Sequence, residues 1–226
     1  MSGGRRGLLA AIGTVFALSG TTLIVVAMAS HNPAPQPPAA AGSLLPTSAR
    51  WSFGPLPSGH RRSPTSVAEP VLPPSKPVTL DIPAIGVHSS LLSLGLKTDG
   101  TVQVPSGTSY DRAGWYRHSP TPGSIGPAVI LGHVSGDGSA SVFFRLGDLR
   151  PGDRVTVSRR DGSVASFEIS RVRHYPKHRF PTKLVYGNTE DAALRLITCG
   201  GLLDSSTGHY VDNIIAFASL VGSQAT

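Results

Sequence analysis

Residues 128–133 read AVILGH, and residues 194–199 read LRLITC. Each stretch is a mostly apolar run of strand length that ends in a reactive side chain, His133 in the first and Cys199 in the second. Short continuous apolar runs are typical of buried strands. The two stretches therefore predict two buried strands, each with a reactive residue at its end.

Further short runs of β-forming residues surround these two stretches, and Gly, Pro, Asp or Asn bounds each of them. They cover residues 78–82, 101–104, 154–158, 164–172 and 214–220. Only residues 141–149 have the spacing of a helix, with Val142, Phe143 and Leu146 on one side. Many short strands between turn signals predict an all-β domain, and their periodicity does not choose between a sandwich and a barrel.

Length, charge and cysteine count exclude several classes of protein. The chain has 226 residues, which allows one domain and an extension but not three domains. Its formal charge is +7, of which residues 1–78 carry +5 and residues 79–226 only +2. A nucleic-acid-binding domain concentrates basic residues on its folded surface, so this distribution argues against nucleic acid as a partner. The single cysteine excludes an intramolecular disulfide and a thiolate zinc cluster.

The beginning of the sequence predicts a membrane anchor. Residues 7–29 carry no charge and are long enough to span a bilayer core of about 30 Å as a helix. Two arginines precede the run, and basic flanks stay in the cytoplasm. We therefore expect a cytoplasmic N-terminus over 1–6, a single-pass anchor in the plasma membrane over 7–30, and the remainder of the chain outside the cell. A cleaved signal peptide is the alternative, because Ala27-Met28-Ala29 resembles a cleavage site.

A proline-rich stretch separates this anchor from the folded domain. Residues 33–77 contain 12 of the 20 prolines and little periodic apolar sequence, so they cannot build a core. We expect a disordered tether over 31–77, a domain over 78–222 and a short tail over 223–226. At about 3.1 Å per residue, such a tether reaches on the order of 100 Å.

The single cysteine is a candidate nucleophile. A free cysteine is commonly a small buried hydrophobe, but an unpaired thiol outside the cell is a liability unless it is used. Cys199 is followed by Gly200-Gly201, which let another chain approach the backbone closely. A cysteine nucleophile needs a proton partner, usually histidine. Of the eight histidines, His133 alone ends a buried strand as Cys199 does, and the alternative is a hydrogen-bonded group at the edge of the core.

An ordered set of motifs around these residues resembles the sortases, the membrane-anchored cysteine transpeptidases of Gram-positive bacteria. The motifs are Leu131-Gly132-His133-Val134, Leu196-Ile197-Thr198-Cys199, Asp212–Ala218, Gly114-Trp115-Tyr116 with Pro122-Gly123, Phe143–Gly152 and Tyr175–Pro181. They stand in the family's order over about residues 78–220. The Cys-Gly-Gly continuation and Gly208-His209-Tyr210 look most like the class F, actinobacterial branch.

The resemblance implies an eight-stranded β-barrel with short helices, and it implies a reaction. The Cys199 thiolate would attack a carbonyl of an LPxTG-type sorting signal between Thr and Gly, and His133 would protonate the leaving amine. An amine of a peptidoglycan precursor or of a pilin would resolve the thioester, so no nucleotide or other cofactor is needed. The sequence has no carboxylate cluster typical of a calcium site, so we expect no required metal.

One position departs from the family. Sortases carry an arginine at the start of the last strand, where it steadies the substrate and the oxyanion. Asn213 stands at or beside that place, and Val211 is the second candidate position. Asn213 can donate hydrogen bonds to an oxyanion without charge; the alternative is that it merely begins a strand after a turn. Arg112, Arg145 or Arg195 could also reach in, so the third catalytic role stays open.

The family's signal-binding groove is expected beside the nucleophile. One wall of it is implied to be the connection between the strands that lead to Cys199, which suits an apolar Leu-Pro pair. The groove residues that we expect are Phe180, Leu184, Val185, Tyr186 and Thr198. For each of them a packed surface position is the alternative.

Two other functions fit the same residues. A cysteine hydrolase would use Cys199 and His133 but let water resolve the thioester, and the sequence does not separate it from a transpeptidase. A tethered extracellular binding module would use Cys199 only for packing. The first alternative predicts cleavage without transfer, and the second predicts that Cys199→Ala leaves function intact.

Overall fold

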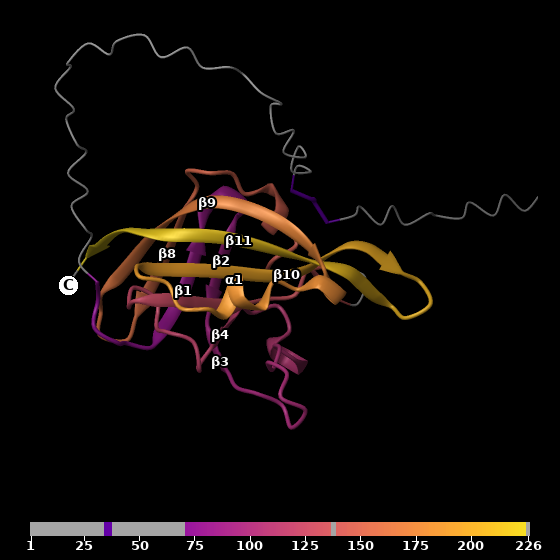
Figure 1. The fold of residues 1–226 in the computed structure, drawn as a ribbon, viewed down its shortest axis with the longest axis horizontal. Coiled ribbons are helices and arrows are strands. Elements are labelled where there is room, and N and C mark those ends of the chain that lie inside the picture. Colours follow the sequence, from indigo (N-terminus) through magenta and orange to yellow (C-terminus); the bar gives the residue numbers. More distant parts are fainter. Residues whose placement is uncertain (1–33, 38–70, 137–138, 225–226) are drawn as a thin grey trace, which may run out of the picture. The chain divides into compact units, whose positions relative to one another are not determined.

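The computed structural model describes residues 34–37, 71–136 and 139–224 (Figure 1). The predicted N-terminal segment 1–6 and the predicted anchor 7–30 lie outside these residues. Within the described part of the chain, no helix is long and apolar enough to cross a membrane.

Strands dominate the described residues. They are β1 (Pro77–Ile82), β2 (Val87–Ser90), β3 (Leu92–Leu94), β4 (Gly114–Tyr116), β5 (Gly126–Leu131), β6 (Ser135–Gly136), β7 (Ser139–Ala140), β8 (Arg154–Arg159), β9 (Val164–Pro176), β10 (Ala192–Asp204) and β11 (His209–Gln224). The helical segments are short: η1 (Pro83–Ile85), η2 (Gly107–Ser109), η3 (Leu146–Asp148), η4 (Lys177–Arg179) and α1 (Thr182–Tyr186). The predicted all-β fold class is confirmed.

One large sheet forms the body of the domain. Its strand order is β2-β1-β8-β9-β11-β10-β5-β4-β3, and β6 pairs with β7 in a separate ribbon. Leu91 alone separates the two edge strands, β2 and β3, so the edges of the sheet meet and the sheet curls into a barrel-like form (Figure 1). The nine strands become the eight that we expected when β2 and β3 are counted as one bent strand.

Several elements differ from the sequence prediction because they are too short to carry a periodic pattern. Strands β2, β3 and β4 contain three or four residues each and were not predicted. The predicted strand 101–104 makes only an isolated bridge, between Leu96 and Val102. The predicted helix 141–149 is a series of turns ending in η3. Its buried hydrophobic side chains lie three apart, at 143, 146 and 149, which matches the three-residue turn of a 3₁₀ helix.

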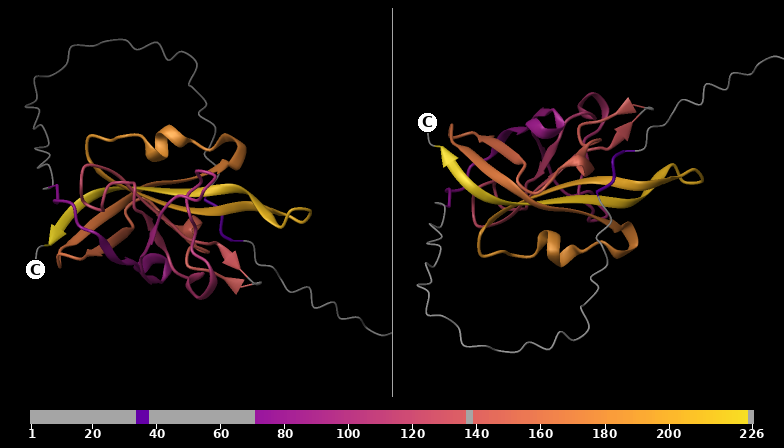
Figure 2. Two further views of the ribbon diagram at one scale, coloured as in Figure 1. Left: turned by 90° about the horizontal axis from the view of Figure 1, so that it is seen from below. Right: turned by 90° about the horizontal axis from the view of Figure 1, so that it is seen from above.

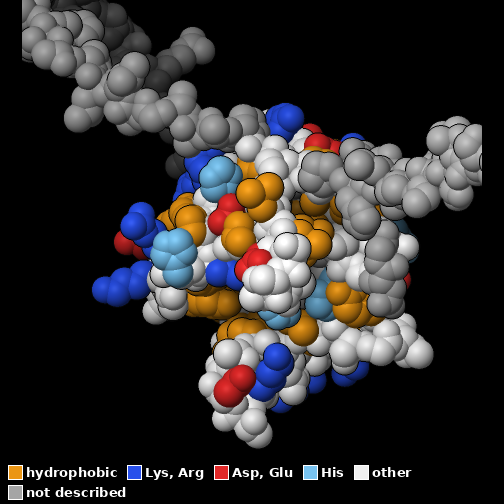
Figure 3. All heavy atoms as spheres, turned by 90° about the vertical axis from the view of Figure 1, so that its right-hand side faces the viewer, with side chains coloured by type: hydrophobic (Ala, Val, Ile, Leu, Met, Phe, Trp, Pro, Cys, Tyr) orange, Lys and Arg blue, Asp and Glu red, His pale blue; other side chains and the backbone are white. Residues whose placement is uncertain are grey.

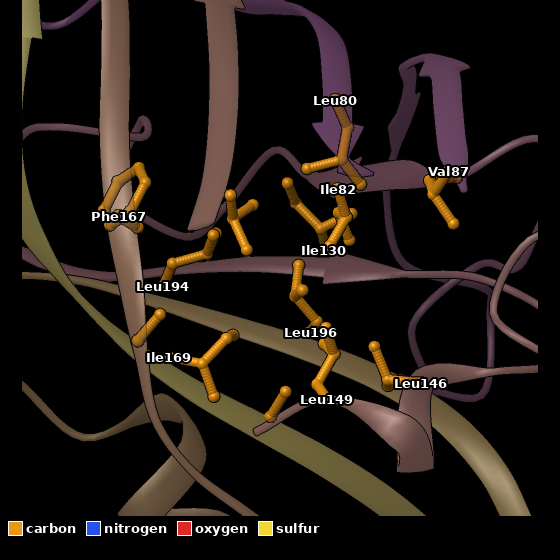
Figure 4. Close-up of a cluster of buried hydrophobic side chains, with 14 of the residues drawn as sticks. Leu80, Ile82, Val87, Ile130, Leu146, Leu149, Phe167, Ile169, Leu194 and Leu196 are labelled. Carbon is orange, nitrogen blue, oxygen red and sulfur yellow. The ribbon is translucent and has the colours of Figure 1, made fainter. Parts of the chain in front are cut away.

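The inner face of the curled sheet encloses the main hydrophobic core. Figure 4 shows side chains from β1, β2, β5, β9, β10 and η3 that point toward one another. Successive residues of a strand point to opposite faces, so Leu194 and Leu196 of β10 enter this core with Ile130 of β5. The strands that lead to His133 and Cys199 are therefore fixed by their packing against the core.

The outer face of β5, β10 and β11 is covered by a second cluster, which we call the outer cluster. The connection between β9 and β10, which contains η4 and α1, lies over this face, as Figure 2 shows in orange on one side of the yellow strands. The buried members are Val129, Val185, Ile197, Ile215 and Phe217, and the half-buried residues packed against them are Tyr116, Leu131, Tyr175, Phe180 and Tyr186. The central strands thus carry packed side chains on both faces.

A short piece of the proline-rich stretch lies against the domain. Ala34 is only 2 % exposed, and Gly201 of β10 donates its N–H to the Gln36 side-chain oxygen at 3.2 Å. A side chain at Gly147 would overlap the Pro35 carbonyl. Residues 34–37 therefore pack between η3 and the end of β10, beside the β10–β11 hairpin (Figure 2).

Candidate active site

The chain segments of β5 and β10 carry the two reactive residues on the same side of the domain. The strands are parallel, and their last matched pair is Leu131 with Ile197. Gly132 continues the pairing by donating its N–H to the Ile197 carbonyl at 3.1 Å. His133 and Cys199 each stand two residues beyond that pair. The two residues therefore lie at equivalent positions just beyond the paired part of β5 and β10, although they are far apart in the sequence. The expectation that Cys199 ends its strand is wrong, because β10 continues to Asp204 in the hairpin with β11.

Cys199 lies on the outer face of the sheet. It follows Ile197 of the outer cluster by two residues, and it is partly exposed. The antiparallel ladder matches Cys199 with Asn213, and Asn213 with Tyr175. Side chains directly opposite one another project to the same side of a sheet. The thiol, the amide and the phenol ring thus share one face, and an amide stands directly across the ladder from the thiol.

His133 is held by two neighbours from the chain before β4. Its Nε2 lies 2.8 Å from the Pro105 carbonyl oxygen, and its ring stacks on Tyr110 with centroids 3.9 Å apart. Within the described residues, no hydrogen bond joins the imidazole to the Cys199 thiol. Catalytic hydrogen bonds often form only when substrate binds. Figure 3, which looks onto the barrel end where the β10–β11 hairpin projects, shows histidine and hydrophobic side chains side by side.

Two of the arginines considered as cation donors are engaged elsewhere. Arg112 donates its Nε–H to the Ser90 carbonyl at 3.3 Å. Arg145 donates its Nε–H to the Asp148 carboxylate at 2.9 Å. Val211, the second candidate position for the family's arginine, is an exposed apolar residue.

The third arginine, Arg195, is buried below the outer cluster. It is 7 % exposed, and its guanidinium lies over the Phe217 ring, as does that of Arg171. Burial lowers the pKa of Arg195 to about 10, and the charge of Arg171 acts in the same direction. Arg195 donates to the Leu194 carbonyl at 3.0 Å, whereas its Nε has no hydrogen-bond partner among the described residues. This arginine is a buried charge with an aromatic neighbour, four residues before the nucleophile.

Three of the predicted groove residues belong to the outer cluster. Val185 is fully buried, and Phe180 and Tyr186 are half-buried against it. Leu184 is 41 % exposed and does not join them. The apolar surface beside Cys199 is thus built by one face of the α1 segment.

Thr198 does not lie in the groove. It is 3 % exposed, and its hydroxyl is buried with no hydrogen-bond partner among the described residues. Because strand residues alternate between faces, the neighbour of Cys199 must point toward the core. The expectation that Thr198 lines the groove is therefore wrong. The alternation of side chains along the strand, which can be read from the sequence, already predicts an inward position.

A cavity of about 590 Å³ continues the aromatic surface away from Cys199. Tyr116, Phe180 and Tyr186 line it, with ring centroids about 6 Å apart from Tyr116 to Tyr186 and from Phe180 to Tyr186. Burial raises the pKa of the Tyr186 phenol, and Tyr116 adds to the shift. The surface can therefore hold an apolar peptide against uncharged rings.

Sequence reasoning missed the aromatic residues that other segments bring to the site. Tyr175 joins from β9, Tyr116 from β4, and Tyr110 from the chain before β4. Tyr116 lies in a motif that carries the family resemblance, whereas Tyr110 carries no signal of its own. Within the described residues, no group of three or more His, Cys, Asp or Glu residues is arranged to hold a metal ion.

A sortase domain model matches residues 80–221 of the chain. Listeria monocytogenes sortase A has a similar structure, with 17 % identity and a TM-score of 0.51, covering 67 % of this chain and 90 % of that one. The SrtA sortase of Actinomyces oris is 18 % identical, with a TM-score of 0.51 and coverage of 70 % and 89 %. The lid mutant of Corynebacterium diphtheriae sortase A is 21 % identical, with a TM-score of 0.50 and coverage of 70 % and 74 %. No curated protein matches the chain.

Proposed function

Because this chain belongs to the sortase family and is a cysteine transpeptidase, we propose that it cleaves an LPxTG-type sorting signal between Thr and Gly. The acyl group passes to a cell-wall amine, of a peptidoglycan precursor or of a pilin. The observation that carries the proposal is the in-register pairing of β5 with β10, because His133 and Cys199 each stand two residues beyond its last matched pair. The Cys-Gly-Gly and Gly208-His209-Tyr210 segments support the class F branch.

The reaction proceeds by two acyl transfers at Cys199. Its thiolate attacks the Thr carbonyl, a C–S bond forms, and the C–N bond to Gly breaks as the His133 imidazolium gives its proton to the leaving amine. The neutral imidazole then takes a proton from the incoming amine, which attacks the thioester. A new amide forms and the thiolate is released. In both steps the Asn213 amide donates a hydrogen bond to the oxyanion.

The outer cluster supports recognition of the apolar part of the signal. Phe180 and Tyr186 present half-buried rings beside the nucleophile's face. A Leu-Pro pair buries apolar area against such rings, and each buried methylene contributes about 0.8 kcal/mol. Leu and Pro therefore bind to the α1 segment while Thr reaches Cys199.

The location of the enzyme follows from the start of its sequence. Residues 7–30 anchor it in the plasma membrane as a single helix, with residues 1–6 in the cytoplasm and the catalytic domain outside. This topology places the enzyme on the side where surface proteins and cell-wall amines occur.

The test uses the purified full chain with a fluorescence-quenched LPxTG peptide, with and without a glycine-based amine. We expect cleavage, a thioester adduct on Cys199 by mass spectrometry, and a ligated product when the amine is present. Cys199→Ala abolishes cleavage, and His133→Gln lowers kcat by about 10²–10⁴-fold. His174→Gln, an exposed histidine of β9, is the matched control and retains activity.

The outcomes separate the alternatives. Cleavage that never yields a ligated product indicates a hydrolase. No cleavage and no adduct on Cys199 would refute both the sortase and the hydrolase on this signal. An unchanged biological function in Cys199→Ala indicates a binding module.

A further inference from the structure

The ring of His133 is held by a stacked ring on one face and by a hydrogen bond at its edge. The Tyr110 and His133 rings are stacked, with centroids 3.9 Å apart and planes 4° from parallel. In the ring plane, Nε2 lies 2.8 Å from the Pro105 carbonyl oxygen. A carbonyl only accepts, so Nε2 is the donor in this bond. The stack fixes the plane of the imidazole, and the bond fixes its rotation within that plane.

Tyr110 is itself held firmly. Its hydroxyl donates to the Ser135 carbonyl at 2.8 Å, two residues beyond His133. The Ser135 hydroxyl lies 2.8 Å from the Tyr210 hydroxyl of β11. A side chain at Gly136 would overlap the Tyr110 ring. The phenol therefore packs against the same chain segment that carries His133.

We propose that Tyr110 is a positioning residue for His133, which holds the imidazole ready to exchange a proton with the reacting amine. This inference rests on the proposed function, because a proton transfer to the leaving amine requires an oriented ring. We assign Tyr110 a role through His133, because its ring stacks on the imidazole and its hydroxyl bonds the Ser135 carbonyl of the same segment.

The stack suits the step that His133 performs. The face of a phenol ring is electron-rich and attracts a cation placed over it. A stacked Tyr110 therefore favours the imidazolium, which is the form that protonates the leaving amine. It also covers one face of the imidazole, so the ring cannot turn away from the strand end. We therefore expect the stack to raise kcat and to leave KM nearly unchanged.

Three variants separate the ring from its hydroxyl. Tyr110→Phe keeps the stack and loses the bond to Ser135, so kcat stays within about threefold of wild type. Tyr110→Leu removes the stack, so kcat falls about tenfold or more while KM changes less than about twofold. Gly136→Ala keeps the tyrosine itself, but the added methyl group overlaps its ring and forces the ring to move. We expect kcat to fall as it does in Tyr110→Leu. Far-UV circular dichroism and thermal melts establish that each variant is folded.

Two kinetic results overturn the proposal. One is a folded Tyr110→Leu that keeps kcat within about threefold of wild type, and the other is an equal loss in the Phe and Leu variants. A second readout needs no substrate: the NMR shifts of the His133 ring protons move downfield in Tyr110→Leu and stay in place in Tyr110→Phe. Unchanged shifts in Tyr110→Leu also overturn the proposal. If the wild-type chain leaves the LPxTG peptide intact, the proposed substrate is wrong, and the NMR result still decides whether Tyr110 holds His133.

Discussion

At the scale of single residues, Asn213 is the candidate for the third catalytic role. It stands directly across the ladder from Cys199, at or beside the position where the family resemblance implies an arginine. An amide donates hydrogen bonds but carries no charge, so it stabilises an oxyanion through its dipole alone. Of the three arginines considered as substitutes, Arg112 and Arg145 are bonded elsewhere and Arg195 is buried.

We predict that Asn213→Ala lowers kcat by about 10–10²-fold, somewhat less than the loss of a strong oxyanion donor. Asn213→Asp, which is nearly isosteric, loses at least as much because its carboxylate repels the developing negative charge. Asp212→Asn is the matched control, since its side chain points to the opposite face. Steady-state kinetics with the LPxTG peptide measure kcat and KM of each variant. Full activity in Asn213→Ala would show that the residue only begins a strand.

Arg195 gives a prediction about stability. Its buried guanidinium has an aromatic neighbour and a carbonyl, but no carboxylate partner among the described residues. Replacing a buried charge by an apolar side chain of similar volume is often neutral or stabilising. Arg195→Met should therefore lower the free energy of unfolding by less than about 1 kcal/mol, or raise it. Urea denaturation measures this, with Arg171→Met as control. A decrease in the free energy of unfolding of more than about 3 kcal/mol would show that the Arg195 guanidinium pairs with a buried group that the variant leaves unpaired.

The positions of Cys199 and His133 beside each other's strands were predictable, and the contacts that hold His133 were not. Cys199 and His133 each end a continuous apolar run, and that pattern is local in the sequence. Tyr110 touches His133 from a segment with no regular pattern, and only the closed fold brings the two rings together. The inward direction of Thr198 was predictable from strand alternation, which the expectation did not apply.

At the scale of elements, the connection between β9 and β10 decides what lies on the face of Cys199. Its α1 segment buries Val185 against β5 and β11, and thereby brings Phe180 and Tyr186 over the sheet. Leu184 in the same segment faces outward. The α1 segment therefore carries side chains that face the sheet and a side chain, Leu184, that faces outward, and mutations can compare the two.

We predict that Tyr186→Ala raises KM for the LPxTG peptide about tenfold with little change in kcat, because apolar binding area is lost. Phe180→Ala acts in the same direction. Leu184→Ala, from the outward face of α1, is the matched control and keeps KM within about twofold. Peptide titrations of initial rate give both constants. An equal rise in KM for Leu184→Ala would mean that the peptide binds to the other face of the segment.

Long strands were predicted well and short elements poorly. Strands β1, β5, β8, β9, β10 and β11 cover all or part of predicted runs, because each buries enough alternating or continuous apolar residues to leave a pattern. Strand β2 holds its place by pairing with β1 across a short turn, and β3 and β4 hold theirs by pairing with each other and, for β4, with β5. Such pairing depends on tertiary contacts, which three residues of sequence do not encode.

At the scale of the whole molecule, the barrel-like closure is what makes the site possible. The sheet order brings β5 and β10 together although a long stretch of chain separates them. The packed inner core keeps the two strands in register, so the positions of His133 and Cys199 depend on the entire sheet. Mutations in the core should act on the reaction through stability.

The packing of residues 34–37 against the domain changes how the proline-rich stretch is interpreted. These residues lie against the domain, and the described chain resumes at residue 71. Segments 34–37 and 71–77 of the predicted tether thus belong to the described residues. If residues 7–30 span a membrane as predicted, only residues 31–33 stand between the predicted anchor and Ala34 in the sequence, and each residue spans at most about 3.6 Å. We then expect the enzyme to act on substrates that are themselves held at the membrane surface.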